Sequence, residues 1–142
     1  MSIKSKKLNL KKTHRGTLKS FSNKNKYLIW GNWGLKSIET KIIGQKEVLS
    51  AKQTLTRFIK KYSTVFVKVL FNKTYTKRTS ESRMGSGKGS IFSRNSIIYK
   101  DQILFELNTV DNYWAFLALS KASKKLSIKT KIIHKKYLND II

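Results

Sequence analysis

The 142-residue chain contains no cysteine and no proline, and only seven of its residues are acidic. Without cysteine the chain cannot form disulfide bonds, thiolate metal sites or a cysteine nucleophile. No stretch approaches the roughly eighteen consecutive apolar residues of a membrane-spanning helix. The acid-free N-terminal segment has no apolar stretch long enough for a secretory signal, and it is consistent with either a weak import presequence or a plain basic arm.

Basic side chains dominate what is present. The chain has 31 Lys and Arg residues and a formal net charge of +24. Self-repulsion at this density disfavours the compact state unless a polyanion supplies the counter-charge. The basic residues run from Lys4 to Lys136, which suits a protein wrapped by RNA on several faces better than one that grips a single duplex groove. The predicted partner is therefore a nucleic acid, and an anionic membrane surface is the alternative.

The hydrophobic fraction of 39% fits a folded protein. We predict a basic arm over residues 1–26 and a single α+β domain over 27–142, in which two helices cover an antiparallel or mixed sheet. Apolar residues at 3.6-residue spacing predict the first helix over 45–62. Asp111, as N-cap, predicts the second helix over 111–126, with Trp114 on its buried side.

Strands are predicted where β-branched and aromatic residues are dense or alternate. A glycine-punctuated turn, Gly31 to Gly34, follows the first predicted strand, residues 27–30. The polar, glycine-rich stretch 71–89 is predicted to be a long loop, which in a compact domain is more often functional than not. The predicted strands lie at 27–30, 35–43 and 64–70, in a hairpin over 96–107, and within 127–137.

The stretch GSGKGS, residues 85–90, looks at first like a nucleotide-binding loop. A P-loop needs G-x-x-x-x-G-K followed by Ser or Thr. With Gly87 and Lys88 as its G-K pair, the first glycine falls on Ser82 and the magnesium-binding hydroxyl falls on Gly89, so both positions fail. The two histidines lie far apart and the carboxylates are scattered, so we predict no catalytic residue, no metal site and no cofactor. A P-loop-like nucleotide-binding enzyme remains only a weak alternative.

The same glycines can serve a different purpose. They allow positive φ and close backbone approach. Exposed N–H groups beside Arg83 and Lys88 would then form a concave phosphate-binding surface. This composition predicts a loop that lies against RNA.

The motif RMGSGKGSIFSR, residues 83–94, resembles the pattern that marks the L-sixteen family of large-subunit ribosomal proteins. Four further segments resemble other parts of that family in the same order: KKTHRG (11–16), WGNWGLKSIE (30–39), KKYSTVFVKVL (60–70) and KKLSIKTKII (124–133). The resemblance implies a fold of the α/β-hammerhead type and no enzymatic activity. It also implies a place near the base of the central protuberance, with large-subunit rRNA, A-site tRNA and neighbouring ribosomal proteins as partners and no membrane.

The predicted site residues combine the basic arm, the glycine-punctuated turn, the basic face of the first helix and the loop. The residues expected to bind rRNA are Lys6, Lys7, Lys11, Lys12, His14, Arg15, Trp30, Gly31, Gly34, Lys36, Arg57, Lys60, Lys61 and Lys68. The loop residues expected to face rRNA or tRNA are Lys77, Arg78, Arg83, Met84, Gly85, Gly87, Lys88 and Gly89.

Abundant Lys, Asn and Ile together with absent Pro indicate AT-rich coding. This bias favours an organellar ribosome, that of the mitochondrion first and of a plastid-type organelle second. A free or transient RNA-binding protein is the alternative reading of the whole chain.

Overall fold

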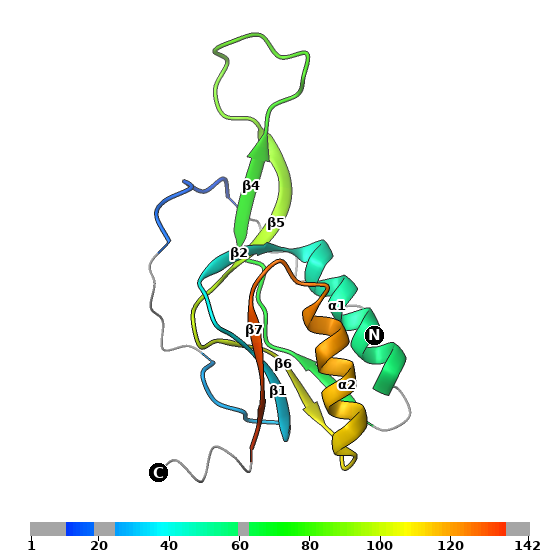
Figure 1. The fold of residues 1–142 in the computed structure, drawn as a ribbon. Coiled ribbons are helices and arrows are strands. Elements are labelled where there is room, and N and C mark those ends of the chain that lie inside the picture. Colours follow the sequence, from blue (N-terminus) through cyan, green and yellow to red (C-terminus); the bar gives the residue numbers. More distant parts are fainter. Residues whose placement is uncertain (1–10, 19–24, 60–62, 136–142) are drawn as a thin grey trace.

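The computed structural model describes residues 11–18, 25–59 and 63–135. These residues form two helices and two antiparallel sheets, which confirms the predicted α+β class (Figure 1). The larger sheet has the strand order β3-β6-β1-β7 and the smaller one the order β2-β5-β4. In chain order, the elements are β1 (Trp33–Ser37), β2 (Lys41–Gly44), α1 (Gln45–Ile59), β3 (Thr64–Val67), β4 (Lys73–Lys77), β5 (Ser90–Ile98), β6 (Ile103–Asn108), α2 (Asn112–Ser123) and β7 (Thr130–His134).

The core lies between the larger sheet and the two helices, which run side by side in Figure 1. Strand β6 is central to it, because all its residues from Ile103 to Leu107 are buried. Helix α2 packs on β1 and β7, and α1 packs on α2 and β3. No helix in the described ranges is long and apolar enough to cross a membrane.

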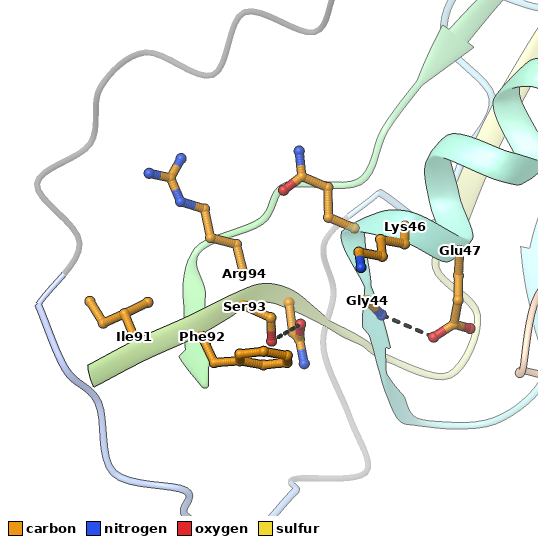
Figure 2. Close-up of a pocket in the computed structure, with 9 residues that line it drawn as sticks. Gly44, Lys46, Glu47, Ile91, Phe92, Ser93 and Arg94 are labelled. Atoms are coloured by element: carbon orange, nitrogen blue, oxygen red, sulfur yellow. Dashed lines mark hydrogen bonds between the residues drawn. The ribbon is translucent and has the colours of Figure 1, made fainter. Parts of the chain in front are cut away.

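Helix α1 presents the apolar stripe that its sequence predicts, with Val48, Leu55 and Ile59 fully buried. Its first turn is fixed by Glu47, whose carboxylate accepts the N–H of Gly44 at 3.2 Å (Figure 2) and the N–H of Ser127 at 3.1 Å. Partial burial opposes ionisation of Glu47, but the hydrogen bonds from Ser127 and Gly44 outweigh it and lower its pKa. The predicted last turn, residues 60–62, lies outside the described residues.

Helix α2 begins at the predicted cap, since the Asp111 carboxylate accepts the N–H of Tyr113 at 3.0 Å. The predicted burial of Trp114 is wrong, because this side chain is 37% exposed. The buried side of α2 consists mainly of small side chains instead, and this helix packs on α1, β1 and β7. The residues of α2 that are buried are Ala115, Ala118, Leu119 and Ala122.

Three sequence predictions need correction. Residues 27–30 form no strand, and β1 already begins at Trp33, inside the predicted turn. The predicted loop 71–89 contains a strand, β4, whose Thr and Tyr residues pair with β5. Strand β5 accordingly starts at Ser90, and the irregular loop shortens to residues 78–89.

The backbone at 29–31 is held by Glu106 rather than by a strand partner. Glu106 is fully buried on β6, and its Oε2 accepts the N–H groups of Ile29, Trp30 and Gly31 at 3.2, 2.7 and 3.1 Å. Its other oxygen, Oε1, accepts no well-aligned hydrogen bond but lies 3.2 Å from Nζ of Lys68. The Lys68 side chain is only 8% exposed, so its charge balances Glu106 inside the protein.

We expect Glu106→Gln to lower the free energy of unfolding by about 3–5 kcal/mol, because it leaves the Lys68 ammonium buried without its counter-charge. Urea unfolding followed by tryptophan fluorescence measures the change. Glu81→Gln, in the exposed loop, is the matched control and should change little. A loss below 1 kcal/mol for Glu106→Gln would contradict this account of the core.

Candidate nucleic-acid interface

The β4–β5 hairpin projects away from the helices and carries the glycine-rich loop at its far end (Figure 1). Every residue from 78 to 88 is exposed. At the tip, Met84 is 95% exposed although it is apolar. The sequence motif therefore lies on the part of the fold that is most accessible to a partner.

The loop has an internal brace. Nη2 of Arg78 donates to the carbonyl oxygens of Arg83, at 2.7 Å, and of Gly85. Gly85 and Gly87 adopt φ values of +89° and +77°, which L side chains rarely take. Arg78 thus holds the loop in shape, whereas the exposed Arg83 guanidinium forms no ion pair with a carboxylate of the described residues.

The described part of the basic arm lies against this hairpin. Nζ of Lys12 donates to the carbonyl oxygen of Lys88 at 2.8 Å, and Nζ of Lys88 donates to that of Thr13 at 2.6 Å. Oγ1 of Thr74, on β4, donates to the Lys11 carbonyl oxygen at 3.0 Å. These reciprocal contacts join the arm and the loop into one surface.

Further contacts continue this surface along β4. Nζ of Lys73 donates to the carbonyl oxygen of Arg15 at 2.5 Å, and the Arg15 guanidinium lies 5.8 Å from the centre of the Tyr75 ring. His14 is exposed beside them. We call the surface formed by residues 11–15, 73–78 and 83–88 the arm–hairpin surface; within it Thr74 is buried.

The predicted turn residues divide into exposed and buried ones. Trp30 is 57% exposed, and Nζ of Lys68 lies 3.8 Å from the centre of its ring. Gly31 and Gly34 are buried, and a Cβ atom at Gly31 would stand 2.5 Å from the Leu107 carbonyl oxygen. A Cβ atom at Gly34 would stand 2.5 Å from Cδ2 of Leu28 and 3.3 Å from the Phe105 carbonyl oxygen, so close packing accounts for both glycines without an RNA contact.

Two of the predicted lysines are used in ion pairs. Lys36 lies 3.0 Å from the Asp101 carboxylate, and this contact lowers the pKa of Asp101. Lys68 is nearly buried against Glu106, which leaves little of it to meet RNA. Four other predicted residues lie outside the described residues: Lys6, Lys7, Lys60 and Lys61.

Arg57 belongs to a second basic region, whose other described cations are not among the predicted site residues. It lines the groove between α1 and α2 together with Lys121, Lys124 and Lys125. None of the four forms an ion pair with a carboxylate of the described residues. The spacing of the three lysines places them on one side of a helix end, and this signal was available in the sequence.

Nothing in the described residues resembles a catalytic centre or a metal site. They include no cluster of three His, Cys, Asp or Glu side chains that could hold a metal ion. The surface offers cations and exposed backbone N–H groups, which suit phosphate recognition. The class of protein defined by this fold and surface is a polycationic α+β protein without catalytic machinery in its described part.

The family model described as ribosomal protein L16p/L10e matches residues 5–133. Large ribosomal subunit protein uL16 of Carsonella ruddii (strain PV) is 40% identical over 134 residues, which cover 94% of this chain and 99% of that protein. Large ribosomal subunit protein uL16c of Phaeodactylum tricornutum is 35% identical, covering 92% of this chain and 94% of that protein. The uL16 of Thermosipho africanus is 34% identical, covering 90% of each.

The chain belongs to the ribosomal protein L16p/L10e family. It is a structural protein of the large ribosomal subunit and not an enzyme, and its partners are ribosomal RNA and other ribosomal proteins. The predicted family is confirmed.

We expect Gly89→Ala to loosen the base of the loop, because the new Cβ would stand 2.5 Å from the Lys77 carbonyl oxygen. Local stability of the hairpin should fall by about 1–2 kcal/mol. Amide hydrogen exchange of β4 and β5 measures the effect. Gly44→Ala is the matched control, since its Cβ would make only ordinary contacts, with Glu47 Oε1 at 3.5 Å and Asn95 Oδ1 at 4.0 Å. Equal exchange in the two variants would show that the close approach at Gly89 does not matter.

Proposed function

We propose that this protein binds large-subunit rRNA through the arm–hairpin surface and that loop 78–89 faces the A-site tRNA. The observation that carries the proposal is the reciprocal pair of hydrogen bonds between Lys12 and Lys88 and between Lys88 and Thr13, which unites two basic segments distant in sequence. A continuous basic surface can follow an RNA backbone over several phosphates, whereas two separate segments would each have to be ordered on binding.

The roles differ along this surface. Lys11, Lys12, His14 and Arg15 contact rRNA phosphates from the arm, and we propose the same for Lys6 and Lys7. Arg83 and Met84 approach the tRNA side, with Gly85 and Gly87 allowing close backbone approach. Arg78 supports the loop from within, as its two carbonyl partners require.

Arg83→Ala should weaken binding to large-subunit rRNA by about 1–3 kcal/mol, because a guanidinium can contact a phosphate or a guanine edge with two donors. Filter binding at one fixed salt concentration measures the loss, and ribosomes carrying the variant should also bind A-site tRNA more weakly. Glu81→Gln, in the same exposed loop, is the control. Unchanged affinity with the fold intact would make Arg83 an ordinary surface residue.

We also propose that the ribosome is organellar, mitochondrial first and plastid-type second. The AT-rich coding bias supports this assignment, and so does the similarity to proteins named uL16c, at 35% identity over 92% of the chain for Phaeodactylum tricornutum.

Fluorescence microscopy of the tagged native protein should place it in mitochondria. A signal in plastids would support the second compartment, and a signal in the cytosol would refute both.

A further inference from the structure

Strand β5 has an open edge beside the start of α1. On one side it pairs with β4 from Ser90 to Asn95. On the other side it pairs with β2 only from Asn95 to Ile98, because β2 ends at Gly44 and the chain turns into α1. No described strand therefore covers this edge at residues 91–94.

A pocket of about 600 Å³ lies at this edge (Figure 2). It is formed by the first residues of α1 and by the open part of β5. Its lining residues are Gly44, Gln45, Lys46, Glu47, Ile91, Phe92, Ser93, Arg94 and Asn95.

A β-bulge presents Phe92 at the pocket. Tyr75 faces Ser93 and the next β4 residue, Thr76, faces Ile91, so Phe92 is the extra residue on β5. Bulges redirect side chains and recur beside functional sites. The ring is 71% exposed, and Nζ of Lys77 lies 5.4 Å from its centre. Packing in the core therefore does not account for an aromatic residue at this position.

Charged and polar side chains line the same pocket. Arg94 and Lys46 bring positive charge, and Figure 2 shows Arg94 extending from β5 on the side away from the Phe92 ring. Asn95 Oδ1 accepts the Ser93 hydroxyl at 3.2 Å, which leaves the amide NH₂ as a donor toward a ligand. The one carboxylate, that of Glu47, is already engaged by two backbone N–H groups.

An aromatic face, two cations and side-chain amides together fit a nucleotide whose base is not paired. A protein strand added to the same edge would use the backbone groups but would gain nothing from the two cations. We propose that this open-edge pocket binds an unpaired segment of ribosomal RNA that crosses the strand edge, with one base stacked on Phe92 and a flanking phosphate beside Arg94 and Lys46. The inference rests on the proposed rRNA binding and adds a site outside the arm–hairpin surface.

The first test compares a single-stranded probe with a duplex probe. Purified protein is titrated with a twelve-nucleotide oligouridylate and with an RNA duplex of the same length. Phe92→Ala should weaken oligouridylate binding about tenfold and leave duplex binding unchanged, because the loss of one base–aromatic contact is specific to an unstacked base. Phe92→Tyr should retain the affinity. Tyr113→Ala removes an aromatic side chain that is 69% exposed elsewhere and should have no effect.

The second test distinguishes the phosphate contact from the base contact, and an RNA ligand from a protein ligand. Arg94→Gln should reduce the slope of log K against log salt concentration by about one, because one phosphate contact is lost. With p-benzoylphenylalanine in place of Phe92, irradiated large subunits should yield a crosslink to RNA. A crosslink to a protein, or equal oligouridylate affinity for the wild type and Phe92→Ala, would overturn the pocket assignment. If large subunits still contain the Phe92→Ala protein, the proposed rRNA binding holds even where the pocket assignment fails.

Discussion

The buried Glu106 carboxylate is the interaction on which the arrangement of this protein depends. It is the one charged side chain with no exposed surface among the described residues. Through one oxygen it fixes three consecutive backbone N–H groups before β1, and through the other it meets Lys68 just after β3. Because β6 lies between β3 and β1, this single group ties the segments on both sides of the central strand. Trp30 then covers the Lys68 ammonium.

A protein with 31 basic and seven acidic residues cannot neutralise itself by ion pairs. Several of its cations instead donate to backbone carbonyl oxygens, as Lys12, Arg78 and Lys88 do in the arm–hairpin surface. Such contacts order irregular segments but leave the positive charge uncompensated. The positive charge of these side chains therefore stays available for the rRNA binding that we propose.

Local signals in the sequence were sufficient for the α+β class, the apolar stripe of α1 and the Asp111 cap, since each depends on neighbours within a few turns. The β-prone residues at 27–30 predict a strand, whereas the backbone at 29–31 is bound by Glu106, about 76 positions away, which no local pattern reveals. Burial of Lys68 depends on the same distant carboxylate. Alternation within Lys73–Lys77 could have revealed β4, but the bulge at Phe92 follows from strand register, which no local pattern specifies.

The most direct test of the central claim is sedimentation of the tagged protein from gently lysed cells, followed by a high-salt wash. The account predicts that the protein travels with the large ribosomal subunit and stays bound through the wash, because the proposed rRNA contacts extend along the whole arm–hairpin surface and involve many phosphates. Recovery at the top of the gradient, or ready release by salt, would contradict the account and identify a free or transient RNA-binding protein.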